Sequence, residues 1–201
     1  MSKGSGEVRY AEVERESLET RVQVVLDLDG GTKRDIMTGI PFFDHMLKST
    51  AYYSGIDLGV QAEGDLPVDD HHTVEDVGIC IGRAIRAALV DSQPIERFGS
   101  AHGVMDDALV LCALDISGRG MLFYDCVFQR DALGGLSTEN VREFFRALAH
   151  YAGITIHIRK IDGFNDHHLC EAVFKAFGLA LHQAVRRAEH RPGHSTKGML
   201  D

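Results

Sequence analysis

The sequence predicts an α+β fold in which one β-β-α-β-α unit occurs twice, giving two sheets with helices packed between them. Three observations support this prediction. Some segments alternate polar and apolar residues as strands do, others space apolar residues three and four apart as helices do, and both kinds follow the same order in each half of the chain. We expect a single domain, 1–201, with repeats at roughly 9–95 and 96–190 and a C-terminal tail at 191–201.

The first half is predicted to contain two strands, a helix, a third strand and a second helix, at 10–17, 20–28, 40–55, 56–65 and 70–89. Polar and apolar residues alternate in both opening strands, as in RVQVVLDL, and Asp29, Gly30 and Gly31 then favour a turn. Pro41 and Gly55 suit the start and the end of the first helix. The second helix carries its apolar residues on one face, so we expect that face to be buried.

The second half repeats this order, with two strands, a helix, a strand and a helix predicted at 108–118, 121–129, 137–153, 154–160 and from 165 onward. Individual residues also repeat at a constant offset of 98, where Ala51, Tyr53, Gly55 and Ile56 match Ala149, Tyr151, Gly153 and Ile154. After a loop two residues shorter, a series beginning at His71, His72 and Glu75 matches one beginning at His167, His168 and Glu171. Two unrelated amphipathic helices could share Val and Ala by chance but hardly His-His-x-x-Glu, so we infer a duplicated unit.

Composition and charge narrow the classes of protein. The 201 residues with 44% hydrophobic content suit a packed domain, and no apolar run approaches the roughly 20 residues needed to cross a bilayer. The opening MSKGSGEVRY lacks the apolar stretch of a secretory signal, so we expect a cytoplasmic protein. A formal net charge of −9 argues against nucleic acid and membranes as partners. The cysteines are scattered within apolar stretches and are interpreted as reduced core residues: Cys80, Cys112, Cys126 and Cys170.

Each His-His-x-x-Glu block places imidazole and carboxylate donors on one face of a helix, because positions three and four apart lie one above the other. Such donors suit a divalent transition metal. Adjacent histidines diverge by about 100° around a helix, so the two of each pair should serve different ions. At the offset of 98, a further histidine in the first half aligns with a glutamate in the second. The candidate metal ligands are His45, His71, His72, Glu75, Glu143, His167, His168 and Glu171.

The same residues also have a simpler interpretation. A single His-His-x-x-Glu block near a helix start is more often a cap and a solvated face, with Asp70 and Asp166 as reasonable N-caps. His45 and Glu143, taken alone, could be surface residues. Two blocks at equivalent positions favour the metal site. The other histidines have no such partners and are interpreted as ordinary: His102, His150, His157, His182, His190 and His194.

Six segments, in this order, closely resemble the imidazoleglycerol-phosphate dehydratase family of histidine biosynthesis: PFFDHML, DDHHTVEDVGI, ALDISGRG, EFFRALA, NDHHLCEAVFKAFGLAL and STKGML. The resemblance runs from about Arg9 to the end of the chain. It implies a duplicated fold of the ribosomal protein S5 domain 2-like type, a 24-subunit homo-oligomer, and two divalent metal ions per site, expected to be Mn²⁺, at sites shared between subunits. It also implies a lyase that converts imidazole-glycerol phosphate to imidazole acetol phosphate.

The resemblance further implies how the reaction proceeds. The proton to be lost is not next to a carbonyl, so a metal-bound imidazolate expels the neighbouring hydroxyl, and a carboxylate removes the proton that becomes acidic in the diazafulvene-like intermediate. Glu19 in SLETRV matches the family's substrate-contacting glutamate and is our candidate general base. Cations and a hydroxyl that suit a phosphate match the remaining contacts: Arg97, Arg119, Lys175, Ser195 and Lys197. Asp106 and Asp107 fall in a segment that lines the family's site.

The chain departs from the family pattern at two candidate positions. Many members have histidine in place of Tyr53 and of Glu143, and the added negative charge of a glutamate at 143 could change metal affinity. The residues also leave two other functions open. One is a metal-storage or metal-sensing assembly, which would not need Arg97, Arg119 and Lys197, and the other is a two-metal hydrolase, in which the ions would activate water.

Overall fold

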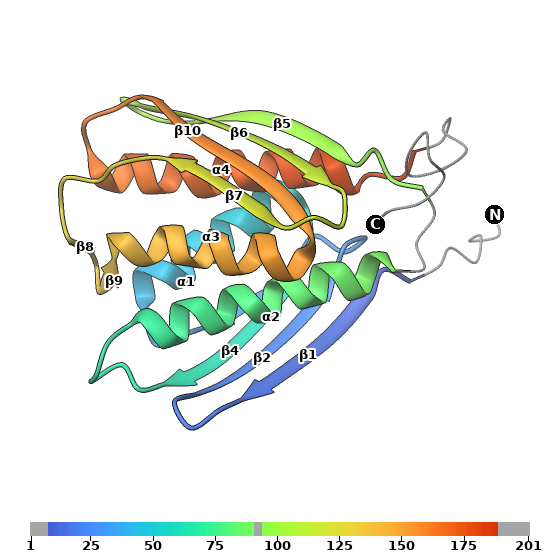
Figure 1. The fold of residues 1–201 in the computed structure, drawn as a ribbon, viewed down its shortest axis with the longest axis horizontal. Coiled ribbons are helices and arrows are strands. Elements are labelled where there is room, and N and C mark those ends of the chain that lie inside the picture. Colours follow the sequence, from blue (N-terminus) through green and yellow to red (C-terminus); the bar gives the residue numbers. More distant parts are fainter. Residues whose placement is uncertain (1–7, 91–93, 189–201) are drawn as a thin grey trace.

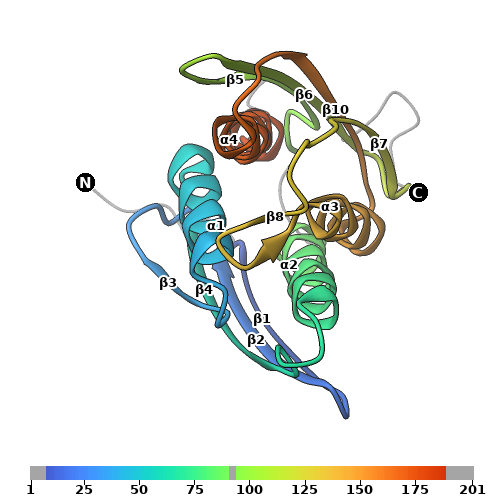
Figure 2. The same ribbon diagram turned by 90° about the vertical axis from the view of Figure 1, so that its left-hand side faces the viewer.

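The computed structural model describes residues 8–90 and 94–188, and within them two four-stranded sheets enclose four helices (Figures 1 and 2). The first half comprises β1 (Tyr10–Glu16), β2 (Thr20–Asp27), β3 (Arg34–Met37), α1 (Pro41–Ser54), β4 (Asp57–Gly64) and α2 (His71–Leu89). The second half comprises β5 (Phe98–Met105), β6 (Ala108–Ile116), β7 (Met121–Asp125), β8 (Ala132–Leu133), β9 (Leu136–Ser137), α3 (Thr138–Ala152), β10 (Ile154–Asp162) and α4 (Asp166–Val185).

The two sheets have the same topology. Their strand orders are β1-β2-β4-β3 and β5-β6-β10-β7, and in each sheet the last strand pairs parallel with its neighbour while the other pairs are antiparallel. Helices α1 and α2 pack on the first sheet and α3 and α4 on the second, so the helices form the two inner layers (Figure 2). The predicted α+β fold, with two sheets around helices, is confirmed.

Each four-stranded sheet contains one strand that we did not predict, β3 in the first half and β5 in the second, and the second half also contains the two-residue strands β8 and β9. β3 is only four residues long and buries only Ile36, which is too little for a visible alternation. In β5 the buried positions are glycines, Gly99 and Gly103, and a Cβ at Gly99 would come within 1.9 Å of the carbonyl oxygen of Ala180 in α4. The strand therefore lacks an apolar pattern because α4 lies directly against its backbone. The strand predicted at 121–129 is β7 and ends at Asp125.

The ends of the helices largely agree with prediction, and the difference concerns the two aspartates expected as N-caps. α1 and α3 end at left-handed glycines, Gly55 and Gly153, as expected. Asp70 occupies the N-cap position of α2, but its side chain makes no cap hydrogen bond. Asp166 lies inside α4, whose N-cap is Asn165. The position predicted for Asp70 is therefore correct and that for Asp166 is wrong, and neither side chain caps its helix because both buried carboxylates bind backbone or side-chain groups of a different segment.

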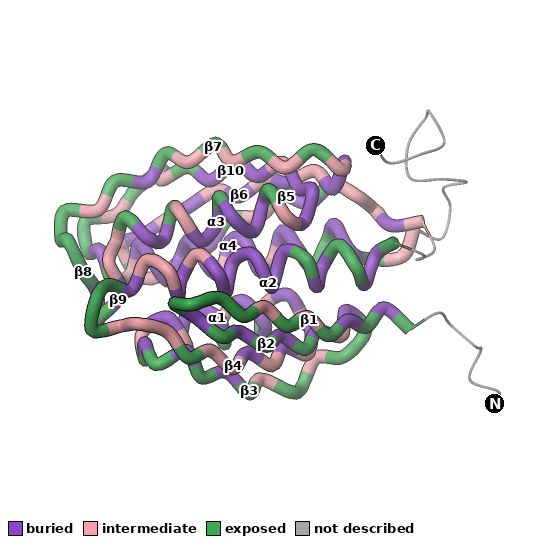
Figure 3. Tube along the Cα trace, turned by 60° about the horizontal axis from the view of Figure 1, so that its bottom comes forward, coloured by how far each residue is buried: buried purple, intermediate pink, exposed green. Residues whose placement is uncertain are grey.

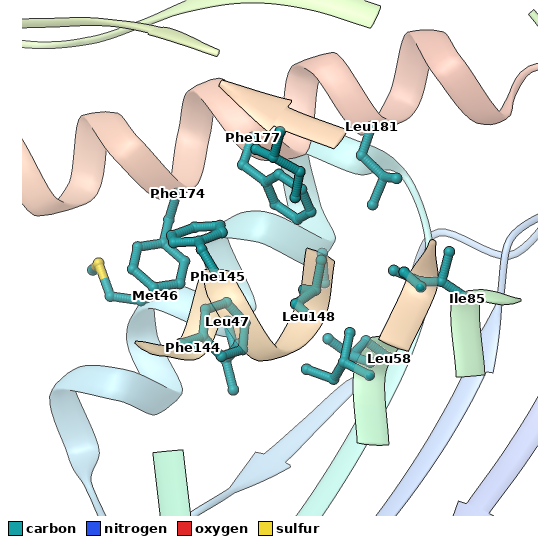
Figure 4. Packing of buried hydrophobic residues seen from close by; sticks show 14 of the residues in the cluster. Met46, Leu47, Leu58, Ile85, Phe144, Phe145, Leu148, Phe174, Phe177 and Leu181 are labelled. Carbon is teal, nitrogen blue, oxygen red and sulfur yellow. The ribbon is translucent and has the colours of Figure 1, made fainter. Parts of the chain in front are cut away.

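A cluster of phenylalanines from α1, α3 and α4 forms the centre of the core (Figure 4). It consists of Phe43, Phe144, Phe145, Phe174 and Phe177. Burying a side chain of this kind stabilises a fold by about 1.5–3 kcal/mol. Around this cluster the strands alternate between buried and exposed residues (Figure 3), so the apolar face of each sheet meets the helix layer.

The helices pair across the two halves, α2 with α3 and α1 with α4. Gly82 in α2 and Gly178 in α4, which match in the repeat, make this pairing close. A Cβ at either position would come within 2.8 Å of a carbonyl oxygen of the partner helix, at Leu148 and at Thr50. The first helix of one half therefore lies beside the second helix of the other half, and this arrangement determines which donors meet.

The four cysteines are free and buried, as predicted. Burial raises the pKa of the Cys80 thiol to about 11 and that of Cys126 to about 12, so both stay protonated at neutral pH. Among the described helices, none is long and apolar enough to span a membrane. The cytoplasmic location stays a prediction.

Candidate metal and substrate site

All four helices begin at the same end of the molecule, on the left in Figure 1, and the predicted donors lie near these helix starts. Six of the eight donors gather in two clusters. We call the first half-site A, which consists of His45, His167 and Glu171, and the second half-site B, which consists of His71, Glu75 and Glu143. Each half-site takes one residue from the first helix of one repeat and two from the second helix of the other.

Half-site A centres on the carboxylate of Glu171 in α4, which is 8% exposed. Its Oε1 lies 3.3 Å from Nε2 of His45 and 3.2 Å from Nε2 of His167. Its Oε2 lies 2.9 Å from the ammonium of Lys175. Burial raises the pKa of Glu171, but hydrogen bonds from Lys175 and His45 outweigh it and hold that pKa below its usual value. The carboxylate is therefore ionised at neutral pH and available as a ligand.

Half-site B lies across the contact between α2 and α3. Nε2 of His71 is 3.9 Å from Oε2 of Glu75 on the same helix. Arg146 of α3 joins the two glutamates, with Nε 2.5 Å from Glu143 and Nη2 2.5 Å from Glu75. We did not predict Arg146, although it follows Glu143 by three positions, which is the spacing of a helical ion pair.

A chain of hydrogen bonds orients His71 from behind. Asp70 accepts hydrogen bonds from the backbone N–H and the hydroxyl of Ser137, at 2.8 and 2.7 Å, and from the side-chain amide nitrogen of Asn140, at 2.9 Å. This places the amide oxygen of Asn140 2.9 Å from Nδ1 of His71. Nδ1 therefore donates, and Nε2 is left with the lone pair that a metal would use.

The second histidine of each block points away from the first, as the helical spacing requires. The rings of His71 and His72 meet at 81°, and those of His167 and His168 at 88°. Nδ1 of His72 lies 3.1 Å from Asp65, and Nδ1 of His168 lies 2.6 Å from Asp107. Both histidines thus lie beside a β-hairpin of their own repeat.

Carboxylates at these hairpins set the charge around His72 and His168. Asp65 accepts a hydrogen bond from His72 and, with Glu19 nearby, raises the pKa of that imidazole. Asp107 accepts the backbone N–H groups of Asn165 and Phe164 as well as Nδ1 of His168, and these contacts hold its pKa well below the usual value. Asp107 therefore orients His168, a role that the sequence pattern did not reveal.

Within residues 8–90 and 94–188, no three His, Cys, Asp or Glu side chains surround a common point that could hold a metal ion. The donors of half-site A touch one another directly instead, and the two glutamates of half-site B are joined through Arg146. Several are also open to solvent, since the side chains of His45, His167 and His71 are 55%, 47% and 42% exposed. The donor types fit a divalent metal, but a single chain offers incomplete sets.

Of the predicted substrate contacts, Glu19 and Lys175 lie near the donors. Glu19 is in the turn between β1 and β2, half-exposed, with Oε1 3.8 Å from Nε2 of His72. It borders a shallow hollow of about 350 Å³, which Asp65 also lines. A cavity of about 700 Å³ opens beside half-site B and is lined by His71 and Glu143. Space for a small substrate therefore adjoins the candidate donors.

Arg97 and Arg119 lie at the opposite end of the molecule. The backbone N–H of Arg97 donates to the carbonyl of Ala184, thirteen positions after Glu171 in α4, which corresponds to about 20 Å along the helix. Its guanidinium pairs with Asp115 at 2.6 Å. Arg119 follows β6, and its carbonyl accepts the hydroxyl of Thr155 at 2.9 Å.

Tyr53 and Asp106 do not join the two clusters. Ser195 and Lys197 lie outside the described residues. Tyr53 is in the last turn of α1, where its ring packs edge-on against Tyr52. Asp106 is 3.4 Å from Nε2 of His168. Asp106 and Asp107 therefore both contact that imidazole.

Comparison with known proteins gives a consistent result. Residues 38–181 match the family model described as imidazoleglycerol-phosphate dehydratase. Curated relatives with this name include those of Cereibacter sphaeroides strain KD131, 50% identical over 197 residues, and of Paracoccus denitrificans strain Pd 1222, 50% identical over 195 residues. Each alignment covers 96% of this chain and 100% of the relative.

Two solved structures share the fold. The crystal structure of imidazoleglycerol-phosphate dehydratase from Staphylococcus aureus subsp. aureus N315 superposes with a TM-score of 0.81 at 35% identity, and covers 89% of this chain and 99% of that one. The Pyrococcus furiosus enzyme in complex with (S)-C348 also gives a TM-score of 0.81, at 39% identity, and covers 94% and 100% of the two chains.

Proposed function

The chain belongs to the imidazoleglycerol-phosphate dehydratase family and is a lyase of histidine biosynthesis, and from this premise we propose that half-sites A and B hold two divalent metal ions, with Mn²⁺ as the expected metal. The observation that carries the proposal is the grouping of imidazole and carboxylate donors from both repeats at one end of the helices. A storage protein or a hydrolase, which the residues alone left open, does not fit this family.

The eight donors would serve two ions per site. Half-sites A and B would each contribute to an ion, and His72 and His168, which point away from them, would bind ions completed by a neighbouring subunit. When bound, the ions would act as Lewis acids that stabilise negative charge on the substrate's imidazole and orient it. Asn140 and Asp107 would hold His71 and His168 with the correct ring nitrogen toward the ion.

Glu19 is our proposed general base. Its carboxylate is 55% exposed and within 3.8 Å of His72, so it can reach a substrate bound beside that imidazole. As the hydroxyl on the ring-adjacent carbon leaves, Glu19 would take the proton from the neighbouring carbon. The C–H electron pair becomes the new double bond, water is lost overall, and the resulting enol tautomerises to the ketone of imidazole acetol phosphate.

The phosphate of the substrate would be bound by cations of another subunit. Arg97 lies about 20 Å from Glu171 in the same chain, too far to hold the phosphate of a substrate bound at half-site A, and Arg119 lies at the same end as Arg97, three positions after Ile116, whose N–H donates to the Arg97 carbonyl. Lys175 is close to Glu171 and would act from the same chain. We therefore propose a homo-oligomer, of the 24-subunit kind expected from the family, whose active sites form between subunits, with Ser195 and Lys197 as further phosphate contacts.

Mixing two inactive variants tests the shared site. Glu19→Gln and Arg97→Ala should each abolish turnover of imidazoleglycerol phosphate with Mn²⁺. Oligomers dissociated and reassembled from both variants should regain part of the activity, because some sites would combine an intact Glu19 with an intact Arg97. Each variant reassembled alone is the control. If the mixture stays inactive although mixed oligomers are present, the site is not shared in this way.

A further inference from the structure

We propose that Arg146 is a positioning residue whose guanidinium takes the place of a divalent metal ion beside Glu75 and Glu143 of half-site B, and that it thereby weakens metal binding there. The inference rests on the proposed metal site. Its guanidinium lies 2.5 Å from carboxylate oxygens of both Glu75 and Glu143. It thereby joins two candidate ligands that belong to different helices and different repeats.

The two half-sites differ in charge at equivalent positions. In half-site A the first helix supplies an imidazole, His45, so the cluster has one carboxylate, which pairs with Lys175. In half-site B the first helix supplies Glu143, so the cluster has two carboxylates. Without a cation between them, Glu75 and Glu143 would repel each other across the contact between α2 and α3. Arg146 offsets the additional charge that Glu143 brings.

Arg146 would also compete with a metal ion for the same electron pairs. It takes Oε1 of Glu75 and Oε2 of Glu143, while Oε2 of Glu75 faces His71 at 3.9 Å. An ion bound between His71 and the two carboxylates must displace the guanidinium or share these oxygens with it. Because all three charged side chains are partly exposed, each ion pair contributes little, and the competition should amount to about three- to tenfold in affinity.

The repeat provides a matched control. Lys48 of α1 lies 98 positions before Arg146 and is its counterpart beside half-site A. Lys48 is exposed, and among the described residues it makes no ion pair, because Lys175 of α4 occupies that role at Glu171. Removing the charge of Lys48 therefore tests the effect of losing one positive charge without breaking a contact to a ligand.

Metal binding by the full-length, chelator-stripped protein tests the proposal without measuring activity. Mn²⁺ is titrated into wild type, Arg146→Gln, Arg146→Lys and Lys48→Gln while the electron paramagnetic resonance signal of free Mn²⁺ is followed. Arg146→Gln should bind Mn²⁺ about three- to tenfold more tightly at one class of site. Arg146→Lys, which keeps the charge but cannot bridge both carboxylates with one planar group, should fall between it and wild type. Lys48→Gln should match wild type.

Thermal unfolding separates this role from a merely structural one. Without metal, Arg146→Gln should unfold at a lower temperature than wild type, and Mn²⁺ should raise its unfolding temperature by more than it raises that of wild type. Unchanged or weaker Mn²⁺ binding by Arg146→Gln would overturn the proposal while leaving the metal site intact. If wild type itself binds no Mn²⁺, the proposed metal site fails. Should Arg146→Gln not fold, as judged by circular dichroism, tighter binding by Arg146→Lys than by wild type is the decisive result.

Discussion

Replacing Asp70 by alanine should destabilise the chain and weaken metal binding at half-site B, with half-site A unaffected. The carboxylate is 8% exposed and accepts three hydrogen bonds from Ser137 and Asn140. Hydrogen bonds to a charged group contribute about 1.5–3 kcal/mol each, but the three share one carboxylate and water replaces part of the loss, so we expect about 3 kcal/mol in total. For a chain of this size the unfolding temperature should fall by roughly 6–12 °C.

The effect on metal binding passes through Asn140. Without Asp70, the side-chain amide nitrogen of Asn140 loses the acceptor at 2.9 Å that helps direct its oxygen to Nδ1 of His71. The ring of His71 would then lose the contact that orients it, and Nε2 would no longer be directed toward Glu75. Loss of a hydrogen bond behind a metal ligand typically weakens affinity by about 10–100-fold. We expect a loss of at least about tenfold at one class of Mn²⁺ site.

The matched control is Asp166→Ala, at the equivalent position of the second repeat. Asp166 is also buried and accepts the backbone N–H groups of Gln129 and Arg130, but its side chain contacts no proposed ligand. Both variants should be less stable in guanidinium chloride, and only Asp70→Ala should lose Mn²⁺ affinity. Equal losses of affinity in the two variants, or wild-type affinity in Asp70→Ala, would refute the reasoning.

Three further predictions concern catalysis, packing and pH. Glu19→Gln should keep near-normal metal content and lose turnover; loss of metal, measured by elemental analysis, would instead make Glu19 a ligand. Gly99→Ala should destabilise the chain by at least about 2 kcal/mol in denaturant titrations, because its Cβ would come within 1.9 Å of the carbonyl oxygen of Ala180; an unchanged midpoint would contradict the close contact between β5 and α4. Hydrogen bonds from the backbone N–H groups of Lys33, Gly31 and Thr32 hold the pKa of Asp57 below its usual value. The stability that Asp57 contributes is therefore present above its unfolded-state pKa of about 3.9 and is lost as the pH falls through its folded-state pKa. Asp57→Asn should therefore lose stability less steeply between about pH 5 and pH 3, and an identical acid slope would speak against this contribution.

Most of the fold could be predicted because its elements carry local patterns. β2 alternates buried and exposed residues along its whole length, and α1 begins at Pro41 and is capped by Gly55 as the residue types suggest. β5 was missed for a physical reason, since Gly99 and Gly103 leave no apolar side chain on the buried face. A strand whose core contact is made by its backbone carries no hydrophobic pattern.

The sequence predicted which residues belong to the candidate site, but not which of them lie together. The repeat identified His45 and Glu143 as equivalent positions, and the structure places both beside the second helix of the other repeat. We did not predict the residues that orient the ligands or compete for them, such as Asn140 and Arg146. Their partners lie on another helix, 71 and 69 positions away in the sequence.

By itself, the sequence determined what one helix can present: the spacing of His167 and Glu171 follows from helix geometry, so local pattern is enough to find those two donors. Only the tertiary structure decided that Glu171 meets His45, 126 positions away, and that Arg97 lies at the far end of the molecule. Such pairings follow from the packing of α1 on α4, which sums many weak contacts along both helices. No segment of the sequence encodes that sum, because it exists only when the two repeats fold together.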